Sequence, residues 1–329
     1  MKLKLSIGVM LVITLAAGLW LWLDRPAPPA KTPVGRPVDL ASLVRPSPAN
    51  APKLKPVAAR PANVSSPMLT ASDGSAVQTI MDVKAGYETR LRAIGSLAGH
   101  LSDADWNGLQ PFLLQPDGLD KTQLGQVIKN ELLDALCALN PPPAGLGEVL
   151  TRMYHDQQQN EVIRDYAVQH LGACYEQVAL QPDSTQALKV IQDTLWEAVN
   201  ETSDSIGGTA LLALKRLSQE YPGFDQNKIA ATALQMAGDN QAGELTQITA
   251  YQVCAQLAVT NALPLLLAAA QNGPTIPVKM SAIGALGRLG GAEQILFLNR
   301  VLAGSQERLK PAAQHALEQI QQTRLASRK

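Results

Sequence analysis

The sequence predicts an all-α protein, an α-solenoid of stacked helical hairpins preceded by a transmembrane helix and a disordered proline-rich linker. Three observations lead to this prediction: an uncharged segment near the start, a run of prolines after it, and a helical pattern that recurs from residue 124 to 325. Hydrophobic residues make up 46% of the chain but aromatic residues only 4%. Alanine and leucine favour helices, whereas strands favour aromatic and β-branched residues, so the composition favours helices.

The first predicted element is a membrane anchor. Residues 5–23 carry no charge and as a helix would span roughly 28 Å, about the thickness of a hydrocarbon core. Lys2 and Lys4 precede this segment, and Trp20 and Trp22 lie at its far end. Short basic termini stay in the cytoplasm and tryptophans favour the membrane interface. We therefore expect a single-pass protein of the bacterial inner membrane with its C-terminal domain in the periplasm. The alternative is a cleaved signal peptide that releases the chain into the periplasm, although signal peptides have shorter apolar regions.

The second predicted element is a linker over residues 24–76, which hold eleven of the 22 prolines and show no helical or strand period. Such a segment is extended or disordered and acts as a spacer. Nine of the 28 Lys and Arg and three of the 28 Asp and Glu precede residue 77, which leaves 19 basic and 25 acidic residues in 77–329. A mildly acidic domain does not favour nucleic-acid binding, which needs a basic face.

The repeats are defined by a helical template. From Val278, apolar or small residues recur at offsets 0, +4, +7, +8 and +11, which is one face of a helix. The template also begins at five other positions: Ile128, Ile163, Ile206, Thr246 and Leu309. Second helices are predicted between these, at about 145–155, 184–199, 225–237, 261–271 and 291–303, with proline or glycine breakers between pairs. The spacing of 31 to 43 residues is typical of degenerate helical repeats.

Two copies carry a family resemblance. Ile163-Arg164…Ala167…Leu171-Gly172 and Val278-Lys279…Ala282…Leu286-Gly287 resemble the HEAT-like repeat of the phycobilisome-lyase type, in which an apolar-basic pair opens the helix and an Ala…Leu-Gly signature follows. The third and fourth copies depart from it; in the third, Gly207 stands at the basic position and Lys215 at the glycine position. The resemblance implies a protein-binding scaffold. It does not imply lyase activity.

The expected domain organisation has three parts. Residues 1–23 form the signal anchor, 24–76 the linker, and 77–329 the solenoid. Within the solenoid, 77–121 is expected to be a degenerate first hairpin that caps the stack, because terminal repeats are atypical. Ser102-Asp103-Ala104-Asp105 reads as a helix cap before Trp106.

The search for chemistry gives no catalytic, cofactor-binding or metal-ligating residues. The four histidines (His100, His155, His170 and His315) show no metal-ligand spacing, and His170 falls on the core template. The three cysteines (Cys137, Cys174 and Cys254) are expected to be buried and free, with a Cys137–Cys174 disulfide as the alternative. No serine-hydrolase, penicillin-binding or kinase motif is present. The sequence therefore predicts that the chain is not an enzyme and takes no cofactor.

Partner contacts are expected on the second helix of each repeat, the usual concave face. The candidates are residue types that are common in binding hot spots, with one glutamate beside them: Arg152, Tyr154, Trp196, Glu197 and Arg300. The predicted function is a membrane-tethered scaffold or assembly factor of the cell envelope that binds protein, with no nucleic acid and no small-molecule ligand expected. Two alternatives remain: a regulator or enzyme acting on an envelope polymer such as peptidoglycan, and a purely structural role.

Overall fold

The computed structural model describes residues 74–97, 101–116 and 123–326. The chain divides into two compact units, residues 1–66 and 67–329, and everything described below belongs to the second unit. Within the described ranges there are fourteen α-helices, two short 3₁₀ helices and no strand, so the all-α prediction is confirmed. The anchor predicted at 5–23 and nearly all of the predicted linker lie outside these ranges. None of the described helices is long and apolar enough to cross a membrane.

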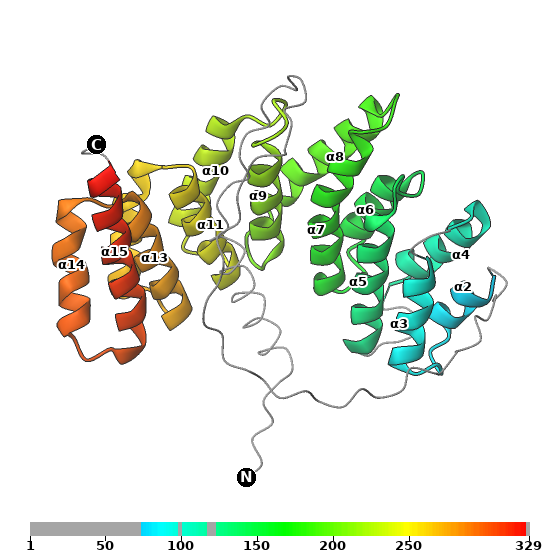
Figure 1. Cartoon of the computed structure of the whole chain (residues 1–329), viewed down its shortest axis with the longest axis horizontal. Helices are drawn as coiled ribbons and strands as arrows, with labels where there is room; N and C mark the ends of the chain where they lie inside the picture. Colours follow the sequence, from blue (N-terminus) through cyan, green and yellow to red (C-terminus); the bar gives the residue numbers. More distant parts are fainter. Residues whose placement is uncertain (1–73, 98–100, 117–122, 327–329) are drawn as a thin grey trace, which may run out of the picture. The chain divides into compact units, whose positions relative to one another are not determined.

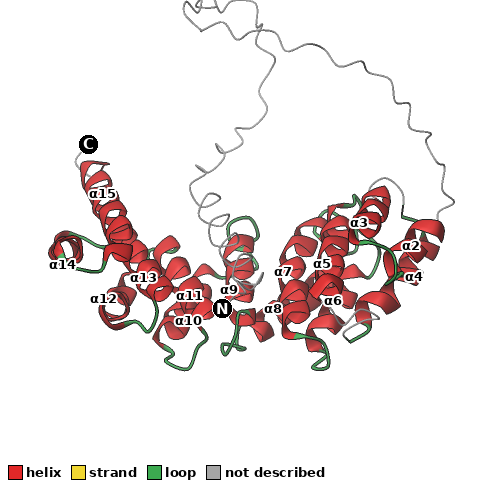
Figure 2. Ribbon diagram, turned by 90° about the horizontal axis from the view of Figure 1, so that it is seen from below, coloured by secondary structure: helices red, strands yellow, loops and turns green. Residues whose placement is uncertain are grey.

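The helices form two layers, which Figures 1 and 2 show from two directions. The odd-numbered helices make a continuous layer in which each packs against the next. They are α3 (Tyr87–Ser96), α5 (Gln123–Ala138), α7 (Glu161–Val178), α9 (Ile206–Leu217), α11 (Glu244–Gln256), α13 (Ile276–Leu289) and α15 (Lys310–Ala326).

The even-numbered helices cover one side of that layer. They are α2 (Gly74–Met81), α4 (Asp103–Leu114), α6 (Leu146–His155), α8 (Thr185–Ala198), α10 (Gln226–Gly238), α12 (Leu263–Asn272) and α14 (Ala292–Ala303). Most pack against the odd helix that follows, which gives the stacked hairpins expected of a HEAT-like repeat. The even layer is less continuous: α2, α4, α6 and α8 pack in sequence, but α8 and α10 are not closely packed. The 3₁₀ helices η2 (Thr260–Ala262) and η3 (Glu307–Leu309) lead into α12 and α15.

The predicted repeat template is the buried face of the odd layer. Its six starting residues are all buried, and so are most of the residues at the later offsets. All six template helices and all five predicted second helices are present, with bounds within a few residues of those expected. Burial of this face removes several large apolar side chains per repeat from water, each worth about 1.5–3 kcal/mol.

Small residues allow neighbouring odd helices to approach closely. A Cβ atom added to Gly287 of α13 would lie 2.6 Å from the Cα atom of Ala316 in α15. A Cβ atom added to Gly172 of α7 would lie 3.1 Å from the Cβ atom of Ala213 in α9. The glycine of the Leu-Gly signature is therefore a packing requirement of the odd layer.

The N-terminal region differs from a single degenerate hairpin. It contains three helices, α2, α3 and α4, and α2 begins at Gly74, inside the segment expected to be linker. The predicted cap of α4 is confirmed as a capping box, in which the backbone N–H of Asp105 donates to the Ser102 hydroxyl and the Asp105 carboxylate accepts from the Ser102 backbone. The Trp106 indole N–H then donates to the carbonyl oxygen of Ala144 at 2.8 Å and joins α4 to the loop before α6.

Candidate functional site

The five predicted contact residues all lie on even-numbered helices. Arg152 and Tyr154 are on α6, Trp196 and Glu197 on α8, and Arg300 on α14. The structure places the first four around the α6–α8 pair, whereas α14 packs against α15 and α13 at the other end of the solenoid. The candidate site is therefore the surface of α4, α6 and α8, and Arg300 is not part of it.

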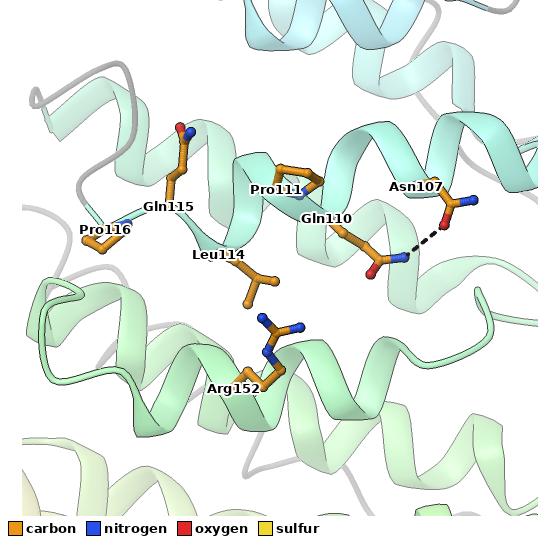
Figure 3. A pocket seen from close by; sticks show the side chains of 7 residues that line it. All are labelled: Asn107, Gln110, Pro111, Leu114, Gln115, Pro116 and Arg152. Carbon is orange, nitrogen blue, oxygen red and sulfur yellow. Dashed lines mark hydrogen bonds between the residues drawn. The ribbon is translucent and has the colours of Figure 1, made fainter.

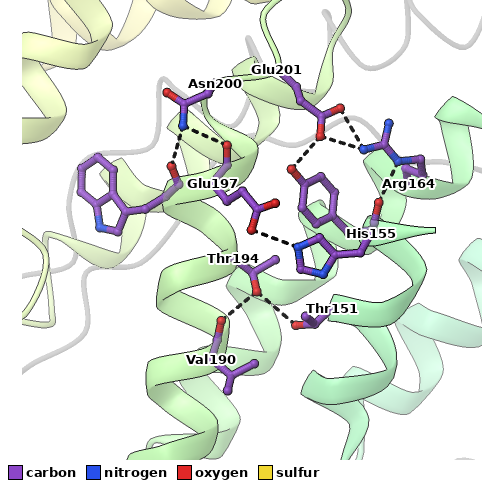
Figure 4. Close-up of polar contacts among 10 residues, drawn as sticks. Thr151, His155, Arg164, Val190, Thr194, Glu197, Asn200 and Glu201 are labelled. Carbon is purple, nitrogen blue, oxygen red and sulfur yellow. Dashed lines mark hydrogen bonds and ion pairs between the residues drawn. The ribbon is translucent and has the colours of Figure 1, made fainter. Parts of the chain in front are cut away.

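A buried polar cluster on the core side of this surface joins α6, α7 and the loop after α8 (Figure 4). The Arg164 guanidinium is almost fully buried and pairs with both carboxylate oxygens of Glu201, at 2.7 and 2.9 Å. The Tyr154 hydroxyl donates to the same carboxylate at 2.6 Å. Burial and the Glu201 hydrogen bond both raise the pKa of Tyr154, so its hydroxyl stays protonated. Tyr154 is buried, and it joins two repeats instead of offering a contact to a partner.

The same arginine caps a helix. Arg164 Nε donates to the carbonyl oxygen of Tyr154 at the end of α6, where helix carbonyls have no internal donor. Arg90 does the same for Ile80 at the end of α2, and Lys129 for Leu113 at the end of α4. In two copies, Ile128-Lys129 and Ile163-Arg164, the apolar-basic pair thus places a cation at the carboxyl end of the preceding even helix. Lys129 is a functional residue of the repeat that the family resemblance did not include, although Ile128-Lys129 carries the same signal.

The exposed contacts between α6 and α8 are polar pairs. His155 Nε2 and Glu197 Oε2 are 3.0 Å apart, and both side chains are about half exposed. The hydroxyls of Thr151 and Thr194 are 3.3 Å apart one turn away (Figure 4). An exposed ion pair of this kind contributes little to stability, about 0–1 kcal/mol. Glu197 therefore lies on an accessible surface and is already paired with His155.

Trp196 fills the position where the even layer is loosely packed. The ammonium group of Lys228, on α10, lies 3.8 Å from the centroid of the Trp196 ring. Gln192, one turn earlier on α8, donates to the carbonyl oxygen of Gly223 at 2.9 Å. These two contacts link α8 to α10 and the loop before it. Trp196 is half-buried and packed against the core, so its main contacts are within the repeat.

A shallow groove, open to solvent along its length, lies between α4 and α6 beside this region (Figure 3). It has a volume of about 480 Å³ and is lined by carboxamide, proline, leucine and arginine side chains: Asn107, Gln110, Pro111, Leu114, Gln115, Pro116 and Arg152. Arg152 extends from α6 toward Leu114 and Gln110 on α4. Among the described residues, its guanidinium has no ion pair with a carboxylate and no hydrogen bond. Arg152 is exposed, as Glu197 and Arg300 are, but those two are bonded to other described groups.

Histidine and cysteine side chains elsewhere are part of the core. His170 is buried on α7, its Nε2 lies 3.1 Å from Asn130 Oδ1, and burial lowers the pKa of His170 to about 4. The three cysteines are buried and free, so the alternative of a Cys137–Cys174 disulfide does not apply to this structure. Across the described ranges, no group of three or more His, Cys, Asp or Glu side chains could hold a metal ion.

Comparisons with known proteins find structures with a similar fold but do not assign the chain to a family. No protein-family model matches the chain, and no curated protein matches it. Human deoxyhypusine hydroxylase in complex with glycerol is similar in structure, with 18% identity and a TM-score of 0.32 over 76% of this chain and 96% of that one. An engineered protein is similar with 16% identity and a TM-score of 0.38, over 76% of this chain and 68% of that one. The class of protein, a stack of helical hairpins, rests on the packing of the chain's own helices.

One prediction needs correction here. The expectation that the chain is not an enzyme does not hold, since an enzyme, human deoxyhypusine hydroxylase, is among the structures similar to it. A fold does not determine function, so the absence of familiar catalytic motifs on a helical-repeat architecture is no reason to exclude catalysis. The match is too distant to assign an activity to this chain.

Proposed function

We propose that this chain is a membrane-tethered scaffold or assembly factor of the bacterial cell envelope, which binds a protein partner through the surface of α4, α6 and α8. The observation that carries the proposal is the groove between α4 and α6, into which Arg152 extends without a partner among the described residues. Arginine is one of the residue types enriched at binding hot spots, where a few side chains supply most of the affinity.

The construction of this surface supports a binding role. The Arg164–Glu201 pair and the Lys129 cap fix the positions of its helices, so the surface is formed before a partner binds. A preformed surface loses less conformational entropy on binding. A groove of about 480 Å³ holds a short segment of a partner. A stable interface buries about 1,600 Å² in total, so the neighbouring exposed faces of α6 and α8 would complete it.

Membrane tethering is part of the proposal and rests on the sequence. The uncharged residues 5–23 would hold the chain in the inner membrane, and the proline-rich residues 24–76 would separate the solenoid from the bilayer. In this arrangement the solenoid meets its partner in the periplasm, at a distance that the linker sets.

In-cell photocrosslinking of the full chain tests the proposal. Photoreactive residues would replace Gln110 in the groove, Arg300 on α14, or Gln169 on the exposed side of α7 as a control position. We expect one envelope protein to be captured from position 110 and not from 169 or 300. Capture should fall when Arg152→Glu is added. If the chain is folded and exported but no position captures a protein, the scaffold function is wrong.

A further inference from the structure

We propose that the α4–α6 groove binds an extended acidic segment of the partner protein, with the carboxylate of an internal Asp or Glu on Arg152. This inference rests on the proposed function and names the chemistry of its ligand. Three properties of the groove lead to it: its charge, its hydrogen-bonding groups and its length.

The charge of the groove comes from Arg152. Glu148 lies one turn earlier on α6, at the spacing that suits an ion pair, yet no pair forms between them in this structure. Arg90 and Arg164, by contrast, donate to helix carbonyls. A planar guanidinium without a carboxylate partner at the side of a groove matches a carboxylate, which it can bind through two parallel hydrogen bonds.

The hydrogen-bonding groups suit a peptide backbone. The hydrogen bond that Gln110 Nε2 donates to Asn107 Oδ1 is long, at 3.4 Å, so both carboxamides can also bond to a ligand. The two carboxamides therefore offer the groove both acceptors and donors. An extended segment has the complementary N–H and C=O groups.

The length of the groove indicates an internal residue of the ligand and not a chain end. Asn107 and Leu114 are seven residues apart on α4, or roughly 10 Å along the helix axis. That distance accommodates about three residues of an extended chain. Gln115 and Pro116 continue the lining beyond the end of α4, and Arg152 faces the stretch around Gln110 and Leu114. A carboxylate on Arg152 would thus have ligand residues on both sides, and Leu114 and Pro111 offer apolar contact to their side chains.

A charge-reversal selection tests this ligand chemistry. The full chain, in detergent micelles, would be used to select binders from random heptapeptides displayed inside a phage coat protein, where neither peptide end is free. The wild-type chain should enrich peptides with Asp or Glu at one fixed position. The variant Arg152→Glu should enrich Lys or Arg at that position, and Arg300→Glu, a matched change on α14, should keep the acidic preference. Binding of a selected acidic peptide should weaken at least about fivefold in Arg152→Gln.

The outcomes separate the two proposals. An acidic preference that reverses with Arg152 supports the groove assignment. Enriched peptides without an acidic preference, or with a preference that Arg152→Glu leaves unchanged, overturn it, while the crosslinking result at position 110 can still stand. Selection of peptides only when a C-terminal carboxylate is displayed would also overturn it, because the ligand would then be a chain end. Failure to enrich any peptide, together with no crosslinked protein, would reject both proposals. Circular dichroism melting of each variant excludes misfolding as the cause.

Discussion

Arg164 Nε donates a hydrogen bond of 2.7 Å to the carbonyl oxygen of Tyr154, the penultimate residue of α6. This contact shows what the basic residue of the repeat does. Helix ends leave carbonyls without donors, and a cation placed there both satisfies them and interacts favourably with the helix dipole. In the fourth copy Gln247 stands at the basic position, and its Nε2 donates to the carbonyls of Asp239 and Ala242, just beyond the end of α10. An uncharged donor at this position therefore bonds to the loop that follows the helix and not to a carbonyl inside its last turn.

Replacement of this arginine should destabilise the solenoid strongly. Arg164→Met would leave the Tyr154 carbonyl without its donor and the Glu201 carboxylate with the Tyr154 hydroxyl as its remaining donor. Loss of one member of a buried pair costs about 3–5 kcal/mol. Because Glu201 remains partly exposed, we expect the lower end of that range. Urea unfolding followed by far-UV circular dichroism measures the change.

Lys189→Met is the matched control, because Lys189 pairs with Asp193 on the exposed surface of α8. We expect that change to lower the free energy of unfolding by less than about 0.5 kcal/mol. Equal effects of the two substitutions would contradict the capping role of Arg164.

Two glycines of α13 should respond to alanine with opposite signs. In Gly287→Ala the new Cβ would meet the Cα atom of Ala316 at 2.6 Å, so α13 and α15 must separate, at a cost of about 1–3 kcal/mol. In Gly284→Ala the new Cβ has no atom within 4 Å, and alanine is the better helix former by about 1 kcal/mol. The difference in thermal midpoint between these variants tests whether the Leu-Gly signature is a packing requirement. Stabilisation by both would refute it.

The repeat architecture could be predicted from sequence because it depends on periodic burial. Six template helices keep apolar residues on one face, and that face is the core, so pattern and packing coincide. The site could not be predicted in the same way. Tyr154 and Trp196 are residue types common in hot spots, but Glu201, in the loop after α8, and Lys228, on α10, determine that they act within the repeats.

The groove could not be predicted from the sequence for a related reason. Its α4 side is formed by a helix in the region predicted only as a degenerate cap, and nothing in the local pattern pairs α4 with Arg152 of α6. The sequence shows only two relevant features of Arg152, its residue type and its place on a second helix. Long-range pairing of helices with few repeat features cannot be read from one sequence.

Acidification should weaken the fold through His170. Its pKa falls from 6.5 to about 4 on folding, so the unfolded chain binds more protons between these values. Stability is therefore complete above pH 6.5 and decreases as the pH falls toward 4, with a loss of about 2 kcal/mol at pH 5. Urea midpoints at pH 7 and pH 5 measure this, and His170→Gln should reduce the dependence. The neighbouring Asp134, whose raised pKa has the opposite effect, is well exposed and should subtract little.

The three thiols should be unreactive in the folded chain. Burial raises the pKa of Cys174 and of Cys254 to about 12, and it raises the pKa of Cys137 above its usual range as well. Thiolates are the reactive form, so a thiol reagent at pH 8 should label none of them until urea unfolds the solenoid. Rapid labelling of any of the three in the native chain would show that its helix opens locally. If only one of the three thiols can be labelled after unfolding, the other two form a disulfide in the purified protein.

The loose packing between α8 and α10 has a mechanical consequence. The odd layer runs unbroken beneath this point, while the even layer is joined there mainly by the Trp196–Lys228 contact and the bond from Gln192 to Gly223. Bending stiffness depends on both layers, so a load applied along the solenoid would flex it at this junction. The N-terminal repeats, which carry the groove, and the C-terminal repeats would then move relative to each other about this junction.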